Sequence, residues 1–231
     1  PAPAEPIGPR PYAPSKGLID TSAALSPLDR GQEDRGQNGA QDSRRNGPGD
    51  ADRFRRGRLI HALLQRLPEL EPAARAAAGS RTLAAMAGDI GQAGRDEILR
   101  EVLAILTDPA LEPLFGPDSQ AEVPVTGMVR LAATPESLPL IVSGQIDRLV
   151  VTADRIRVID FKTNRPPPRT VDAVPPIYIE QMAAYAALLA EIYPGRVIDC
   201  ALLWTVGPRI MALDSAVLER AASALSPGLQ V

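Results

Sequence analysis

Two hydrophobic segments, 139–151 and 155–161, constrain the fold of this 231-residue chain more than any other feature. Both are rich in Val, Ile and Leu, and only a short polar turn separates them. This arrangement is typical of a β-hairpin. We therefore expect two antiparallel strands whose turn is centred between Ala153 and Asp154.

The expected register predicts a charged cluster inside this hairpin. It places Asp147 directly opposite Asp160, at a Cβ separation of roughly 4.5–5.5 Å where like charges destabilise a sheet. Lys162 follows Asp160 by two residues, so both side chains project from the same face of the strand. A divalent cation would offset the two carboxylates, and oxygen ligands favour Mg²⁺ or Mn²⁺. The ammonium of Lys162 could then stabilise charge on a phosphoryl oxygen.

A second interpretation uses the same three residues. Asp147, Asp160 and Lys162 could form a salt-bridge cluster on a solvated sheet face, and the residues alone leave both interpretations open. One compositional fact favours chemistry: of the 25 basic residues, only Lys16 and Lys162 are lysine. A chain that avoids lysine yet retains one inside a strand is expected to use it.

The remaining pattern predicts an α/β fold with a mixed sheet. A leucine-rich helix from Asp52 should end before Pro68, because proline cannot continue a helix. Further helices are expected at 69–78, 81–89, 95–107, 109–115, 177–192 and 214–224. Further strands are expected at 120–132, 197–206 and 209–213.

Two regions follow from composition. Residues 1–50 are rich in proline and glycine and lack a periodic apolar pattern, so we expect a flexible linker there. Residues 51–231 then form the folded domain. The chain begins with proline rather than methionine, which suggests a piece of a longer polypeptide.

Composition also excludes several classes of protein. No apolar run approaches the roughly 18–20 residues of a membrane span, so no membrane partner is expected. Cys200 is the only cysteine, which excludes a disulfide framework and a four-cysteine iron–sulfur cluster. No phosphate-binding Gly-x-x-x-x-Gly-Lys-Ser/Thr loop occurs, so this chain carries no ATP site of that type. With a net charge of −3, any DNA contact must come from a local basic patch.

Four motifs in this order resemble the RecB-type branch of the PD-(D/E)xK nucleases. They are Gly57-Arg-Leu-Ile-His61, Gly144-Gln-Ile-Asp147, Asp160-Phe-Lys162 and Gln181-Met-Ala-Ala-Tyr185. The resemblance covers roughly residues 57–213. Within this branch the chain is most similar to the C-terminal nuclease domains of AddA-type helicase–nuclease subunits, in particular the alphaproteobacterial ones. The resemblance implies a restriction-endonuclease-like core, a mixed β-sheet flanked by helices, with an N-terminal helical segment.

The resemblance also implies a role for each motif residue. His61, Asp147, Asp160 and the backbone carbonyl of Phe161 would bind the metal, and Lys162 would be the catalytic lysine. The remaining catalytic candidates are Gln181 and Tyr185, which would also contact DNA, and Glu122, which would order the site or contact the metal through water. Further DNA contacts would come from Arg165 and Arg169.

Each of these residues also has a structural interpretation. A single histidine on a leucine-rich helix is more often packed than metal-binding, and the resemblance reverses that expectation for His61. A solvated strand position would explain Glu122, and a helix edge with a half-buried tyrosine would explain Gln181 and Tyr185. Arg148, like Arg165 and Arg169, could contact phosphate, and any of the three could instead be a solvated arginine. Trp204 is expected in the core of the sheet.

The function implied by the resemblance is a Mg²⁺-dependent exonuclease, with Mn²⁺ as an alternative cofactor, in an AddAB-type complex of the bacterial cytoplasm. Such a complex processes double-strand breaks for repair and recombination. The partners would be single-stranded DNA, the helicase portion of the same polypeptide and an AddB subunit. Two alternatives remain: a non-catalytic DNA-binding or docking module with a nuclease fold, and a free-standing nuclease of the same superfamily.

Overall fold

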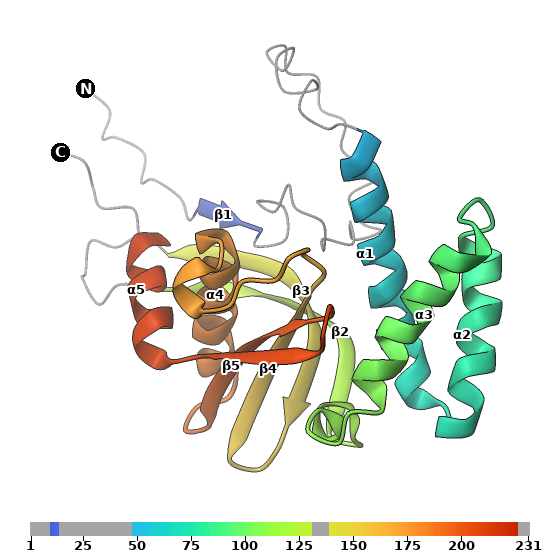
Figure 1. Cartoon of the computed structure of the whole chain (residues 1–231). Coiled ribbons are helices and arrows are strands. Elements are labelled where there is room, and N and C mark those ends of the chain that lie inside the picture. The colour runs from blue at the N-terminus through green and yellow to red at the C-terminus, as the bar shows by residue number, and fades with distance from the viewer. Residues whose placement is uncertain (1–9, 14–47, 131–138, 226–231) are drawn as a thin grey trace, which may run out of the picture.

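The computed structural model describes residues 10–13, 48–130 and 139–225. These residues form one mixed six-stranded sheet with helices on both faces (Figure 1). The strands are β1 (Arg10–Tyr12), β2 (Ser119–Val129), β3 (Leu140–Val151), β4 (Arg155–Lys162), β5 (Val197–Trp204) and β6 (Arg209–Leu213). The helices are α1 (Pro48–Arg66), α2 (Pro72–Met86), α3 (Gln92–Leu106), α4 (Pro176–Ile192) and α5 (Ser215–Leu225), with short 3-10 turns at Leu67–Glu69, Glu112–Phe115 and Val171–Ala173.

The sheet is centred on the long strand β3. The strand order is β1-β3-β4-β5-β6, and β2 pairs along β3 in antiparallel register. One edge of β3 is shared, because β4 pairs with Arg148–Val151 while β1 pairs with Leu140–Val142. Helix α4 connects β4 to its parallel neighbour β5, as a parallel crossover requires. This arrangement agrees with the α/β fold expected from the sequence.

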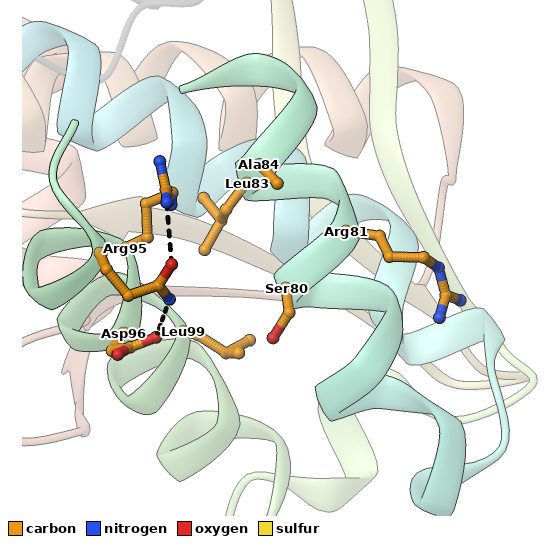
Figure 2. Close-up of a pocket in the computed structure, with 8 residues that line it drawn as sticks. Ser80, Arg81, Leu83, Ala84, Arg95, Asp96 and Leu99 are labelled. Carbon is orange, nitrogen blue, oxygen red and sulfur yellow. Dashed lines mark hydrogen bonds between the residues drawn. The ribbon is translucent and has the colours of Figure 1, made fainter. Parts of the chain in front are cut away.

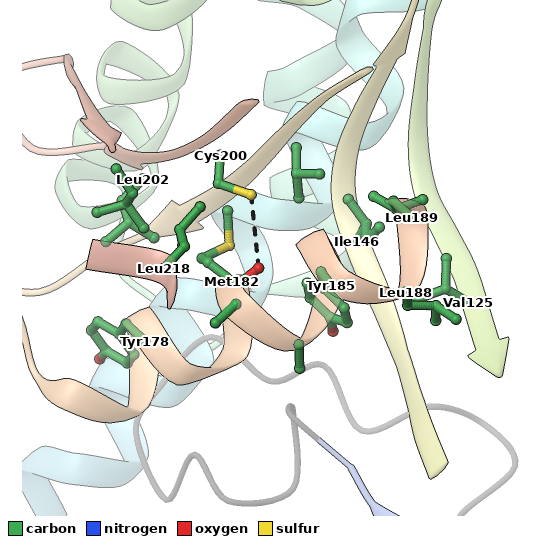
Figure 3. Packing of buried hydrophobic residues seen from close by; sticks show 14 of the residues in the cluster. Val125, Ile146, Tyr178, Met182, Tyr185, Leu188, Leu189, Cys200, Leu202 and Leu218 are labelled. Carbon is green, nitrogen blue, oxygen red and sulfur yellow. Dashed lines mark hydrogen bonds between the residues drawn. The ribbon is translucent and has the colours of Figure 1, made fainter. Parts of the chain in front are cut away.

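A hydrophobic core lies on each face of the sheet. On one face α4 and α5 cover residues such as Val158 and Leu202, and on the other α1 and α3 cover Ile159 and Leu203. Figure 3 shows Tyr178, Met182 and Tyr185 of α4 within the first of these cores. Side chains of β4 therefore alternate between the two cores, as the strand period requires. Trp204 is fully buried, as the sequence predicted.

The helical region differs from the prediction in two respects, and one is that the helix expected at 109–115 is only the 3-10 turn Glu112–Phe115. Two short helices were expected at 69–78 and 81–89, but α2 runs unbroken through Gly79. A Cβ at Gly79 would lie 2.4 Å from Cδ1 of Leu99 in α3. This glycine therefore allows α2 and α3 to pack closely rather than ending a helix.

The segment expected to be a linker, 1–50, contains two described pieces. Strand β1 pairs in parallel with β3, and α1 begins at Pro48. Residues 1–9 and 14–47 lie outside the described residues, and the linker remains a prediction. No helix in the described parts of the chain has the length and apolar character needed to cross a membrane.

Candidate metal centre

The candidate site lies where β3 and β4 separate. Their ladder runs from Val151–Ile156 to Arg148–Ile159, which confirms the predicted register. The ladder does not continue to Asp147 and Asp160. Instead, the Phe161 backbone N–H donates a 2.6 Å hydrogen bond to Oδ2 of the Asp147 side chain. Asp147 therefore lies beside Asp160 and Phe161 at the point where the hairpin opens.

Three side chains form what we call the metal end of the site: His61, Glu122 and Asp147. Each offers one ligand atom, and these three atoms all lie within 4.8 Å of one another. Nδ1 of His61 lies 3.3 Å from Oδ1 of Asp147. Neither ring nitrogen of His61 has a hydrogen-bond partner among the described residues, although the side chain is buried. An imidazole buried in this way is suited to bind a cation.

The metal end combines groups from three elements. His61 is on α1, and its ring packs edge-on against Phe161 of β4, with 5.6 Å between ring centroids. Arg148 of β3 fixes this helix in place, since its Nη2 donates a 2.9 Å hydrogen bond to the carbonyl of Leu64. Its guanidinium also lies 4.9 Å from the centroid of the Phe115 ring.

The backbone is irregular where the strands bring the acidic groups together. Glu122 of β2 has a φ of 53°, a left-handed conformation that is uncommon for a residue other than glycine. It interrupts the ladder between Ala121–Arg148 and Val123–Ile146, opposite Asp147. Irregular backbone of this kind is concentrated at functional sites, and here it accompanies the approach of Glu122 to His61.

The electrostatics of the site reflect buried negative charge. Burial, together with the nearby Asp147 carboxylate, raises the pKa of Glu122 to about 7. Burial likewise raises the pKa of Asp160 to about 6, although Lys162 acts in the opposite direction. Burial alone would lower the pKa of His61, but the carboxylates around it, above all that of Asp147, raise it. The folded protein thus disfavours the full ionisation of these carboxyls, and a cation would reverse that preference.

The other half of the site we call the lysine end: Asp160, Lys162, Tyr178 and Gln181. The fully buried ammonium of Lys162 lies 2.6 Å from Oδ2 of Asp160 and donates a 3.2 Å hydrogen bond to Oε1 of Gln181. It also lies 3.9 Å from the centroid of the Tyr178 ring. The sequence predicted three of these residues and missed Tyr178, whose only signal was its position three residues before Gln181 on the same helix.

Tyr185 makes a structural contact with β3 that its motif did not predict. Its ring is fully buried, and its hydroxyl donates a 3.0 Å hydrogen bond to the carbonyl of Gln145. A Cβ at Gly144 would lie 2.4 Å from that hydroxyl oxygen. Gly144 and Tyr185 therefore fit against each other and hold α4 close to β3. The proposed DNA contacts of Tyr185 and Gln181 stay a prediction.

The arginines considered as phosphate contacts have different environments. Arg148 is only 1% exposed, so the structure places it inside the protein and not on a DNA-binding surface. Arg165 is exposed and forms 2.7 Å ion pairs with both Glu97 and Glu101 of α3. The side chain of Arg169 is exposed. The roles of Arg165 and Arg169 toward DNA stay predictions.

The donor set of the metal end fits a divalent cation. One imidazole and two carboxylates, of which the carboxylates repel each other, suit Mn²⁺ as well as Mg²⁺. Asp160 was predicted as a direct ligand and Glu122 as an indirect one. In the structure Glu122 lies in the cluster with His61, whereas the Asp160 carboxylate is paired with Lys162. The ligand roles of Asp160 and of the Phe161 carbonyl stay predictions.

A separate pocket of about 300 Å³ lies between α2 and α3 (Figure 2). Gln92 bridges its polar side, donating to Asp96 and accepting from Arg95. None of the predicted site residues lines this pocket. It is lined by Ser80, Arg81, Leu83, Ala84, Gln92, Arg95, Asp96 and Leu99.

Comparison with known proteins supports a family assignment. The family model described as the PD-(D/E)XK nuclease superfamily matches residues 36–223. A crystal structure of the protein SSO0001 is 13% identical to this chain, with a TM-score of 0.31, and the match covers 75% of this chain and 84% of that one. No curated protein matches the chain. Divalent metal ions are the cofactors of this superfamily, and the family model spans both ends of the site: the chain belongs to the PD-(D/E)XK nuclease superfamily.

Proposed function

We propose that this chain is a divalent-metal-dependent deoxyribonuclease domain that hydrolyses phosphodiester bonds at the site formed by the metal end and the lysine end. The observation that carries the proposal is the side-by-side placement of two complementary groups. One imidazole and two carboxylates, from His61, Glu122 and Asp147, meet at the metal end, and neither ring nitrogen of His61 has a hydrogen-bond partner among the described residues. The ammonium of Lys162 is held close by, 2.6 Å from Oδ2 of Asp160.

The side chains of the two ends would have different roles in hydrolysis. His61, Glu122 and Asp147 would hold Mg²⁺ or Mn²⁺, with Asp160 beside them. A bound divalent ion would polarise a phosphoryl oxygen and lower the pKa of water. Glu122 is half-buried and is the most exposed member of the metal end, so the scissile phosphate approaches from that side. The ammonium of Lys162 stabilises the negative charge that develops on phosphoryl oxygens.

A more specific role is proposed from the sequence resemblance: this domain acts as the exonuclease of an AddA-type helicase–nuclease. The substrate would then be single-stranded DNA, and the partners would be the helicase portion of the same polypeptide and an AddB subunit. The process would be double-strand-break repair and recombination in the bacterial cytoplasm. A free-standing nuclease would use the same site and differ only in lacking the helicase.

Digestion of DNA tests the proposal. End-labelled single- and double-stranded linear DNA is incubated with the chain and Mg²⁺, Mn²⁺ or EDTA, in parallel with Asp160→Ala. We expect cleavage that requires a metal and is lost in the variant. Metal binding without cleavage of either DNA would favour a domain that depends on its helicase. Neither binding nor cleavage would favour a non-catalytic DNA-binding module.

A further inference from the structure

The ammonium of Lys162 has an unusual set of neighbours. The side chain is fully buried, and an ammonium has three donors to satisfy. Oε1 of Gln181 accepts a 3.2 Å hydrogen bond from the ammonium, and Oδ2 of Asp160 forms an ion pair with it at 2.6 Å. The third neighbour is the face of an aromatic ring, since Nζ lies 3.9 Å from the centroid of Tyr178. Tyr178 belongs to none of the four sequence motifs.

A ring face is an effective partner for a buried cation. The attraction is strongest when the pair is removed from water, as it is here. It is also directional, because the cation must lie over the ring. The carboxylate of Asp160 alone could hold the ammonium from several directions. The ring therefore limits where the ammonium can go.

The ring of Tyr178 is itself held firmly. It is fully buried in the first turn of α4 and lies 6.4 Å from the ring of Trp204, between centroids. Its hydroxyl donates a 3.2 Å hydrogen bond to Oδ1 of Asn164, two residues after Lys162. Gln181 follows Tyr178 by three residues on the helix, so the two side chains share a face. One turn of α4 thus presents both a ring and an amide oxygen to the ammonium.

We propose that Tyr178 is a positioning residue that holds the ammonium of Lys162 in place through its ring face. The inference rests on the proposed nuclease function for its effect on cleavage, but not for the contact itself. The ring is what matters, and the hydroxyl is secondary. Tyr178→Phe should therefore preserve the effect, and Tyr178→Leu should abolish it.

The first test observes Lys162 directly and does not depend on activity. The chain contains only two lysines, so a protein labelled with ¹³C-lysine gives two sets of side-chain signals, and Lys16→Arg assigns them. A methylene beside an ammonium over a ring face is shifted upfield by the ring current. We expect this shift for Lys162 in the unaltered chain and in Tyr178→Phe, and its loss in Tyr178→Leu. Absence of the shift in the unaltered chain would overturn the proposal without any variant being needed.

The second test measures cleavage at saturating Mg²⁺. Tyr178→Phe should cleave within about twofold of the unaltered chain, and Tyr178→Leu should lose about 2- to 30-fold in kcat with little change in KM. Equal kcat in the leucine variant would contradict the positioning role. An upfield Lys162 signal that Tyr178→Leu abolishes, in a chain that neither binds Mn²⁺ nor cleaves DNA, would sustain the contact and refute the proposed function, so the two failures are distinguishable.

Discussion

The metal end and the lysine end lie next to each other, yet their charged groups have different partners. At the lysine end, the ammonium of Lys162 contacts a carboxylate, an amide oxygen and an aromatic face. At the metal end, the ring nitrogens of His61 have no hydrogen-bond partner among the described residues, and Glu122 has a raised pKa. The ammonium of the lysine end therefore has its counter-charge within the protein. We propose that the metal end is completed by a divalent cation.

The largest expected effect comes from removing the charge of the lysine end. Lys162→Ala should reduce kcat by about 10²–10³, the usual cost of losing one group that stabilises transition-state charge. Mn²⁺ affinity should change little, because Lys162 is not at the metal end. Lys16→Ala, at the only other lysine, is the matched control and should cleave normally. Full activity in Lys162→Ala would refute the assignment of the lysine end.

A comparable substitution at the metal end should reduce metal affinity more than it reduces cleavage at saturating metal. His61→Ala removes the only nitrogen donor of the proposed metal end. Mn²⁺ affinity measured by calorimetry should therefore fall by at least about 10- to 100-fold, the cost of losing a residue that merely supports a ligand. Cleavage should recover in part at high Mn²⁺ concentration. Unchanged Mn²⁺ affinity would show that the cation binds elsewhere and would refute the assignment of the metal end.

A smaller effect is expected from the amide of the lysine end. Gln181→Leu removes one acceptor from a buried ammonium, at a cost of about 1–3 kcal/mol. We expect kcat to fall about tenfold with metal affinity unchanged. Glu191→Gln, an exposed change near the end of the same helix, serves as the control. A loss of metal affinity in Gln181→Leu would mean that the two ends do not act separately.

The smallest effect concerns stability and pH in the absence of metal. Folding raises the pKa of Glu122 from 4.5 to about 7 and that of Asp160 from 3.8 to about 6. Protonated carboxyls are favoured in the folded state, so their stabilising contribution is complete below the ordinary values and is lost as pH rises through 6 and 7. With EDTA present, Tm should fall by at least roughly 2–4 °C as pH rises from the ordinary pKa values of these carboxyls to about 7. This is the change in Tm that about 1 kcal/mol produces.

Metal should reverse this trend, since a cation favours the ionised carboxylates. Thermal denaturation with Mg²⁺ should therefore show a Tm that rises, relative to EDTA, as pH increases from 5 to about 8. Glu122→Gln should flatten part of the EDTA curve. A Tm that does not depend on pH in either condition would contradict the picture of uncompensated negative charge.

Much of the site could be predicted from local pattern, and the rest required three-dimensional contacts. The register of the hairpin followed from alternation and turn position, and the ladder confirms it as far as Arg148–Ile159. Pattern could not show that Asp147 accepts the Phe161 N–H in place of a ladder bond. Nor could it show that Arg148 turns inward to α1, or that Gly79 lies inside a helix because Leu99 packs against it.

The roles of Glu122 and Tyr178 illustrate the same limit. Glu122 approaches His61 through a left-handed backbone conformation that no strand pattern predicts. In the sequence, Tyr178 cannot be told from the apolar residues of a buried helix. Only the position of the Lys162 ammonium shows that the ring face of Tyr178 contacts a cation. Sequence pattern thus located the strands and the charged groups, while packing decided which groups meet.

The most direct test of the central claim uses the single histidine of the chain. Protein labelled with ¹⁵N-histidine gives the ring signals of His61 alone, and Mn²⁺ is added in small steps, followed by excess Mg²⁺. If His61 is a ligand of the divalent-metal site, its ring signals broaden at low Mn²⁺ and recover as Mg²⁺ displaces it. Ring signals that remain sharp while Mn²⁺ supports cleavage would contradict the metal end described above.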